Sequence, residues 1–232
     1  MTRLTKFVAT TGLMLAAAAA MPAQAQVAGN IATADIPRTV IGTTAFQAAW
    51  KQVEESYKQQ IDLIRTRAQE RQTLLAKYDK NGDKQVDDAE QATLKKSPDG
   101  TKLTSLETEI QQLSEQIDAG RAYAVEQILL KYSESLDEVV KAKQIKVVVE
   151  PSSLLYAVPE TDITPQITAA LNTRVASVGV VPPANWRPSD AVVQVFQQIT
   201  QRLLTAQYLQ AQQQAAAAQQ QPPANPAAPA GR

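Results

Sequence analysis

The stretch AKQIKVVVEPSSLLYAVPETDITPQITAALN, residues 142–172, decides the fold, because the spacing of its apolar residues changes from a helical to a strand period. Before it, apolar side chains recur every three or four positions, which is typical of amphipathic helices. QIKVVVE (144–150) is rich in β-branched residues and predicts a strand, and LLYAVPE (154–160) predicts a second one. A largely helical chain is therefore expected to close on a small sheet here.

Two helices are expected after these strands. The first covers residues 164–172, with Thr164 as its N-cap and Pro165 at the first helical position. The second is an amphipathic helix over residues 189–211, with Ser189 as its N-cap.

The segments on either side of this second helix show no such periodicity. Residues 173–188 contain several prolines and are predicted to be a linker. The Gln/Ala/Pro-rich end, residues 212–232, has little apolar surface to bury and is predicted to be disordered.

Two long amphipathic helices precede the strands and predict an antiparallel hairpin over residues 44–143. The first runs without Gly or Pro through residues 44–78, and the second covers residues 101–143. Gly120 marks a predicted weak point of the second helix, since a mid-helix glycine costs about 1 kcal/mol relative to alanine. Residues 79–100, which include the turn signal SPDG, form the predicted tip.

A short alternating stretch, NIATADI (30–36), comes before the hairpin and predicts an edge strand that Pro37 ends. Because strands flank the hairpin in the sequence, we expect them to meet at its base. The predicted fold class is α+β, mainly α: a small β body with a long, coiled-coil-like helical hairpin. A core of three strands is marginal alone, so the base is predicted to be an oligomer contact.

Residues 1–25 are predicted to be a secretory signal peptide. Arg3 and Lys6 precede the apolar run FVATTGLMLAAAAA, and Ala23 and Ala25 form an A-x-A cleavage pattern. The run is shorter than the roughly 20 residues that a membrane span needs. The mature chain is therefore expected to be exported to the periplasm in soluble form.

Composition disfavours two classes of function. The chain has 23 basic and 23 acidic residues; removing Arg3 and Lys6 with the signal leaves 21 against 23, a net charge of −2. Nucleic-acid-binding proteins usually carry a basic excess, so that class is not expected. Cysteine and histidine are both absent from the sequence, which removes the usual general base and zinc ligand. An enzyme is not expected either.

The stretch DKNGDKQVDDAE, residues 79–90, resembles the calcium-binding loop of an EF-hand. Oxygen-bearing side chains stand at the six ligand positions of that pattern, which are Asp79, Asn81, Asp83, Gln85, Asp87 and Glu90. The sixth position, where glycine allows a positive φ, is Lys84, at a cost of about 1 kcal/mol. The loop is thus predicted either to bind calcium weakly or to be a polar turn, and no other cofactor is expected.

The order of these elements, together with residues 142–172, resembles the Skp/OmpH family of periplasmic chaperones. The positions that match its C-terminal pattern are Val148, Val149, Leu154, Tyr156, Asp162, Ile163, Thr164 and Ile167. The resemblance covers residues 30–172 of a domain expected over residues 26–172. It implies a homotrimer whose three helical tentacles surround a cavity for unfolded outer-membrane proteins. Family members are often strongly basic, and this chain is not, so membrane contact stays open.

A chaperone of this holdase type binds exposed apolar surface of its clients and needs no ATP. The candidate client-binding residues lie on the apolar seams of the hairpin and are Trp50, Tyr57, Ile64, Leu113, Ile117 and Tyr123. Packing within the hairpin is the alternative role for them, because aromatic residues at helical spacing usually belong to a core. For the whole protein, the alternative is a scaffolding coiled-coil protein of the cell envelope, stiffened by calcium, that binds a partner through its C-terminal helix.

Overall fold

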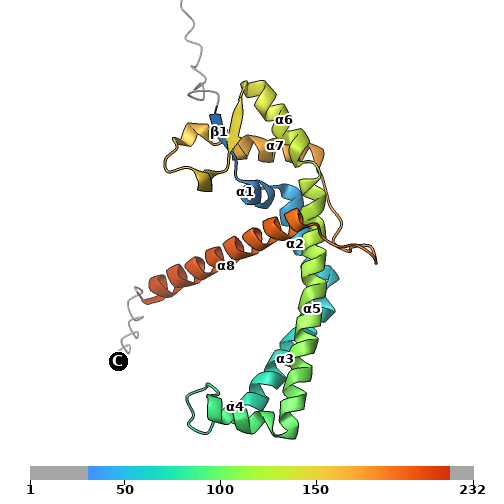
Figure 1. The fold of residues 1–232 in the computed structure, drawn as a ribbon, viewed down its shortest axis with the longest axis vertical. Helices are drawn as coiled ribbons and strands as arrows, with labels where there is room; N and C mark the ends of the chain where they lie inside the picture. The colour runs from blue at the N-terminus through green and yellow to red at the C-terminus, as the bar shows by residue number, and fades with distance from the viewer. Residues whose placement is uncertain (1–30, 220–232) are drawn as a thin grey trace, which may run out of the picture.

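The computed structural model describes residues 31–219, so the predicted signal peptide and the end of the predicted disordered tail lie outside the described residues. Figure 1 shows an elongated molecule with a small body at one end and a helical hairpin extending from it. A last helix leaves from the junction between body and hairpin. None of the helices between residues 31 and 219 is both long enough and apolar enough to cross a membrane.

Helices dominate the described chain and accompany one small sheet, as the predicted mainly α fold requires. The elements, in chain order, are β1 (Ile31–Thr33), α1 (Ile36–Ile41), α2 (Thr44–Ser56), α3 (Lys58–Ala76), α4 (Asp88–Lys95), α5 (Pro98–Leu129), α6 (Tyr132–Lys143), β2 (Val147–Val149), η1 (Pro151–Ser153), η2 (Pro159–Thr161), α7 (Thr164–Arg174) and α8 (Asp190–Gln219). The hairpin consists mainly of α3 and α5, with α4 at its tip, and β1, β2, α1, α6 and α7 form the body (Figure 1).

β1 and β2 form a two-stranded parallel sheet at the base of the hairpin. Its register pairs Ile31 with Val147 and Thr33 with Val149. The opening strand is therefore present, although shorter than predicted, and it meets the strand that follows the hairpin as expected.

The predicted second strand, residues 154–160, is wrong. Residues 154–158 are a loop between the 3-10 turns η1 and η2, and residues 159 and 160 belong to η2. Pro151 and Pro159 begin these turns, and proline has no N–H to donate to a strand ladder. The loop is left without a partner strand among the described residues, and its apolar side chains face outward.

The sequence did not predict α1, because Pro37 was interpreted as the end of the first strand. Asp35 is its N-cap and accepts a hydrogen bond from the Arg38 backbone N–H at 2.9 Å. Pro37 lies in the first turn, where an intrahelical hydrogen bond from the N–H is not needed. Asp35 also accepts hydrogen bonds at 2.8 Å from Arg202 on both carboxylate oxygens, so one residue starts α1 and binds α8.

Both arms of the hairpin are interrupted where the sequence predicted continuous helices. In the first arm, α2 and α3 separate at Tyr57, whose φ is −109° and ψ 20°. In the second, α5 and α6 separate at Leu130 and Lys131. Neither break contains Gly or Pro, so residue types gave no signal for it. The helix does not break at Gly120, the predicted weak point, which lies inside α5.

The start of α7 also differs from its prediction. Thr164 is the first helical residue and Ile163 takes the N-cap position, while Asp162 Oδ1 accepts the Thr164 N–H at 3.0 Å. The Thr164 hydroxyl instead accepts a hydrogen bond from the Asp35 backbone N–H at 3.0 Å. The beginnings of α1 and α7 are therefore joined directly.

α8 continues beyond its predicted end at residue 211. Ser189 precedes it, and its hydroxyl accepts a hydrogen bond from the Val192 N–H at 3.4 Å, in agreement with the predicted N-cap. The helix reaches Gln219, because Ala and Gln have high helix propensity. Part of the stretch predicted to be disordered is thus helical.

The buried apolar residues form two clusters. The larger one fills the body and includes Ile167 of α7 and Ile199 of α8, both fully buried. The smaller one lies where the hairpin meets the body and includes Val53, Ile117 and Val180. Val180 belongs to residues 173–188, so that segment is a packed part of the core and not a free linker. α8 likewise begins as part of the body.

Three segments approach one another closely at residues that we call the Tyr57 junction: Tyr57, Gly120 and Val180. The Tyr57 hydroxyl donates a hydrogen bond to the Val180 carbonyl at 3.1 Å. A Cβ on Gly120 would lie 2.6 Å from that carbonyl oxygen and 2.8 Å from the Tyr57 oxygen. Burial raises the pKa of Tyr57 above its ordinary value. Glycine is therefore required at position 120 for close approach.

Gly120→Ala tests this junction. In an exposed helix the change would stabilise by about 1 kcal/mol. Here the added methyl group must displace Val180 or Tyr57, so we expect the free energy of unfolding to fall by about 1–3 kcal/mol, measured by urea unfolding. Gly179→Ala is the matched control, because the nearest atom to its Cβ, on Tyr123, is 3.7 Å away. A Gly120→Ala variant as stable as the wild type would contradict the junction.

Candidate functional site

The aromatic residues among the six candidate binding residues make contacts within the chain. Trp50 stacks on Phe46 with ring centroids 4.0 Å apart, and the Arg121 guanidinium lies 5.8 Å from the Trp50 ring. Tyr123 meets the Trp186 ring edge-on at 5.3 Å. Tyr57 belongs to the junction described above. These side chains therefore position the hairpin against the body.

The aliphatic candidates divide into two groups. Ile117 is buried in the smaller cluster and offers almost no surface to a ligand. Ile64 and Leu113 are half-buried, and Ile64 packs against the edge of that cluster. Client contact at Ile64 and Leu113 stays a prediction.

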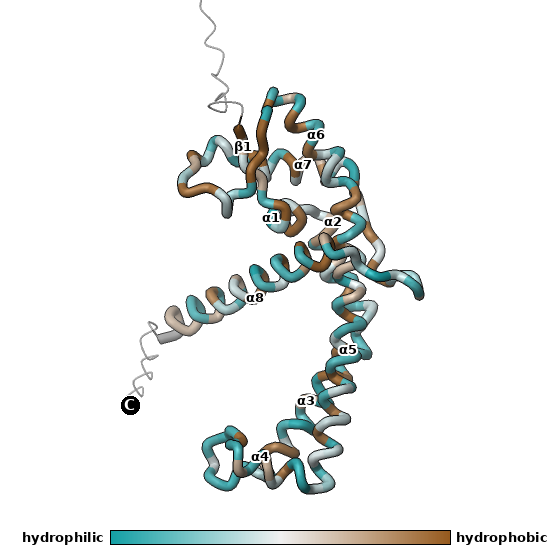
Figure 2. Tube along the Cα trace, in the orientation of Figure 1, coloured by the Kyte–Doolittle hydropathy of each residue, from teal (hydrophilic) through white to brown (hydrophobic). Residues whose placement is uncertain are grey.

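Exposed apolar side chains gather at the base of the molecule, on the sheet and on the loop that follows it. We call them the base patch: Ile31, Val147, Leu154, Leu155 and Tyr156. Leu155 is fully exposed and Tyr156 is 81% exposed. Figure 2 shows hydrophobic colour along β2 and in this loop. The sequence reading missed the patch because it placed residues 154–160 in a paired strand.

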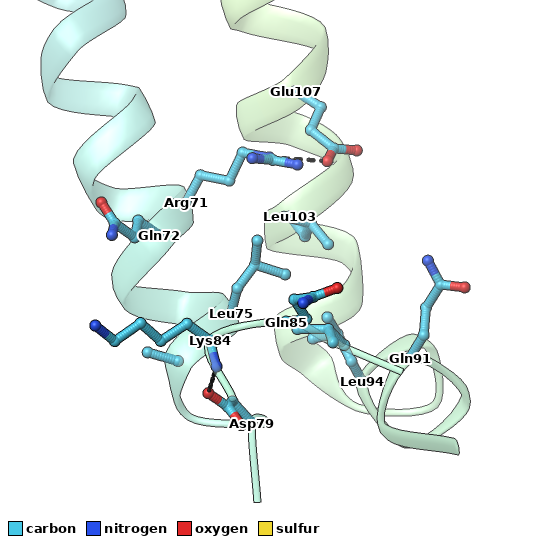
Figure 3. A pocket seen from close by; sticks show the side chains of 12 residues that line it. Arg71, Gln72, Leu75, Asp79, Lys84, Gln85, Gln91, Leu94, Leu103 and Glu107 are labelled. Carbon is cyan, nitrogen blue, oxygen red and sulfur yellow. Dashed lines mark hydrogen bonds and ion pairs between the residues drawn. The ribbon is translucent and has the colours of Figure 1, made fainter. Parts of the chain in front are cut away.

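A pocket of about 510 Å³ lies at the tip of the hairpin, among α3, α4 and α5. Its apolar lining is supplied by Leu75, Val86, Leu94 and Leu103. Arg71, the polar residue on the apolar seam of the first arm, crosses to α5, where its Nε lies 3.0 Å from Glu107 Oε1 at the pocket rim (Figure 3). The pocket was not foreseen, because it forms only when α4 folds back against the two arms.

The Asp-rich loop beside this pocket is organised by its own carboxylates. Asp79 accepts backbone hydrogen bonds from Gly82 at 2.7 Å and Lys84 at 2.8 Å. Gly82 has a φ of 77° and Lys84 a φ of 66°. Lys84 thus adopts the positive φ that the EF-hand pattern demands at its position, despite its Cβ.

The end of the loop forms the start of α4. Asp87 is the N-cap and Glu90 completes a capping box with it. Glu90 is 6% exposed, and its two oxygens accept the backbone N–H groups of Lys80 at 2.7 Å and Asp87 at 3.1 Å. These hydrogen bonds explain how a carboxylate can be buried here.

The calcium prediction rests on six residues, which are Asp79, Asn81, Asp83, Gln85, Asp87 and Glu90. Within residues 31–219, no three His, Cys, Asp or Glu side chains are placed to hold a metal ion together. Asn81 and Asp83 accept backbone N–H groups two residues ahead, at 2.9 and 2.8 Å. The oxygens are of the type that calcium prefers, and each of these side chains keeps further lone pairs beside the hydrogen bonds. Calcium binding stays a prediction.

Comparison with known proteins supplies the family. The family model OmpH, described as outer membrane protein (OmpH-like), matches residues 30–171, more than half of the chain. The chain belongs to the OmpH-like family. This confirms the resemblance inferred from the sequence, and it leaves α8 outside the matched OmpH-like domain.

Two further comparisons add little to this assignment. The curated proteins gave no match. The crystal structure of a candidate outer membrane chaperone (OmpH-like) from Caulobacter crescentus CB15 is similar over 78% of this chain and 99% of that chain. The sequence identity is 17% and the TM-score 0.38, so the likeness carries no argument about the structure. The family assignment therefore rests on the sequence match.

Lys84→Gly is expected to stabilise the tip loop, because glycine removes the Cβ from a residue with positive φ. The gain should reach about 1 kcal/mol. Hydrogen exchange of the Gly82 and residue-84 amides is the suitable measurement, since the tip can open without global unfolding. Lys84→Ala is the control, because it removes the charge and keeps the Cβ. Equal protection in the two variants would contradict backbone strain at this position.

Isothermal titration calorimetry tests the calcium prediction directly. We expect millimolar calcium to give a heat of binding with the wild type and none with Asp79→Ala, which lacks the first ligand of the loop. No heat with the wild type would reduce the loop to a polar turn.

Proposed function

We propose that this protein is a periplasmic holdase chaperone that keeps unfolded outer-membrane proteins soluble without ATP and acts as a homotrimer. The observation that carries the proposal is the match of residues 30–171 to the OmpH-like family. The predicted signal peptide supports export to the periplasm.

A holdase needs apolar contact surface on a frame that does not collapse. The long helix α5 has 32 residues, which corresponds to a length of about 48 Å. Ion pairs join the two arms: Arg67 to Glu109 at 2.8 Å and Arg71 to Glu107 at 3.0 Å. These ion pairs align the two arms with each other. They add little to the stability of the hairpin, because exposed ion pairs contribute at most about 1 kcal/mol.

The tip pocket and the half-buried seam residues Ile64 and Leu113 are the proposed client contacts on this frame. An unfolded chain that places apolar side chains there leaves the free pool, and its aggregation slows. Each contact buries little area and binds weakly, so the client is released when it finds a more stable fold. No energy source is needed for this cycle.

The base patch is the proposed subunit contact of the trimer. A two-stranded sheet is marginally stable by itself, and here the paired residues Ile31 and Val147 are both about half exposed, at 51% and 48%. Leu155 and Tyr156 project from the neighbouring loop. Covering these side chains with a second and third copy would supply the buried area that the small body lacks.

Light scattering of the mature protein tests the assembly. We expect a trimer at micromolar concentration. The double variant Leu155→Glu/Tyr156→Glu should shift it to monomer, because each copy would bring two carboxylates into the buried subunit contact. The control is Leu130→Glu/Val181→Glu, which places the same charges on apolar residues that are 70% and 69% exposed and lie away from the base patch. A wild type that is monomeric would overturn the trimer.

The holdase activity is tested by dilution of an unfolded outer-membrane barrel from urea into buffer. Equimolar trimer should suppress its light scattering, and removal of residues 204–232 should leave that suppression in place if the hairpin is the working part. The cut lies after Leu203 because Ile199 and Arg202 belong to the body. No suppression by the wild type would favour the scaffolding alternative, for which the exposed end of α8 is the proposed partner-binding segment.

A further inference from the structure

The distal half of α8, residues 204–217, has no packing partner among the described residues, and we call it the α8 arm. The proximal half packs on the body: Val192 and Ile199 are buried, and Leu203 is half-buried. Every side chain from residue 204 to residue 217 is exposed, including Leu204 at 61% and Tyr208 at 64%. The arm extends roughly 21 Å past the body at the α-helical rise.

The arm is the end of a 30-residue helix, and its Ala and Gln residues favour the helical state. Propensity alone gives only marginal stability in water. Residues 203–219 contain no charged side chain, so no ion pair along the helix supports the arm. Packing of an apolar face is the usual source of stability for such a helix.

The apolar stripe changes face where the arm begins. The stripe that packs on the body passes through Ile199 and Leu203, and the next positions on the same face, 207 and 210, are both glutamine. A second stripe starts at Leu204 and continues through Tyr208, Ala211 and Ala215. Its spacing of four, three and four residues is that of a coiled-coil seam, and its alanines permit close approach of another helix. The arm thus presents its seam away from its own body.

The chemistry of the arm favours another copy of itself over other partners. Helices that lie on a membrane surface carry Lys or Arg on their polar face, and the arm has neither. An uncharged Gln-rich helix is self-compatible, since no like charges meet across a homomeric contact. Leu209, which is 51% exposed, lies on another face of the arm. The arm also points to the same side of the hairpin as the loop that carries Leu155 and Tyr156 of the base patch (Figure 1). A second copy bound at the base patch would therefore lie on the side toward which the arm points.

We propose that the α8 arm packs through Leu204, Tyr208, Ala211 and Ala215 against the α8 arm of a second copy of this chain, as a helical extension of the subunit interface. The proposal rests on the proposed oligomeric assembly through the base patch. Arms that meet in this way cross the space between neighbouring hairpins beside the bodies. They would tie the hairpins together at the body end and leave the tips free.

Single cysteines test the contact, because the natural chain contains none. Ala211→Cys places a thiol on the seam, and Gln213→Cys places one on the opposite face of the same turn. With diamide as the oxidant that takes up the two thiol hydrogens, we expect interchain disulfides to form at least tenfold faster in Ala211→Cys. Both variants should have the light-scattering mass of the wild type.

Equal cross-linking rates in an intact oligomer would overturn the arm contact and leave the base-patch assembly standing. A monomeric protein would overturn both. The charged pair Leu204→Glu/Tyr208→Glu gives a second measurement: its oligomer should dissociate at a concentration at least tenfold higher than that of Gln210→Glu/Gln213→Glu, which adds the same charge on the other face. Equal dissociation of these two variants would also contradict the contact.

Discussion

The hydrogen bond from Tyr57 to the Val180 carbonyl, made across the bare Cα of Gly120, joins three segments on which the rest of the molecule depends. It lies where α2 ends, where α5 passes from hairpin to body, and where the chain returns toward α8. Its own net contribution is only about 1 kcal/mol. Its larger effect is geometric, because it places Val180 in the core and so sets the point from which α8 starts.

The body next to this junction is small, and Asp35 joins its helices to one another. That residue caps α1, receives Arg202 from α8, and donates its backbone N–H to Thr164 at the start of α7. Burial, with the nearby charge of Asp35, raises the pKa of Tyr132 to about 12. The Asp35–Arg202 pair is partly exposed and contributes little by itself, so the burial of Val192 and Ile199 accounts for most of the attachment of α8.

Apolar surface is distributed in a way that fits assembly better than a solitary chain. The candidate aromatic residues of the hairpin are used for internal packing, whereas most of the exposed large apolar side chains lie on the base patch and on the α8 arm. The tip is built differently: its Asp-rich loop satisfies backbone N–H groups with carboxylates, and α4 folds over an apolar pocket. The proposed contacts between copies and the proposed client contacts thus lie at opposite ends of the molecule.

The sequence by itself determined the periodic features: the helical hairpin, the strand on each side of it, the Asp-rich tip, the helix with Ser189 at its start and the OmpH-like family. These follow from residue spacing, which local backbone geometry converts directly into helix or strand. The positions where the helices break became visible only in the folded chain, since Tyr57 and Leu130 carry no local signal and Tyr57 binds the distant Val180 carbonyl. The same holds for the exposure of Leu155 and Tyr156, which depends on the absence of a pairing strand. Gly120 shows the difference most clearly: by propensity it is a weak point of a helix, but contact with Tyr57 and Val180 makes it the one residue type that fits there.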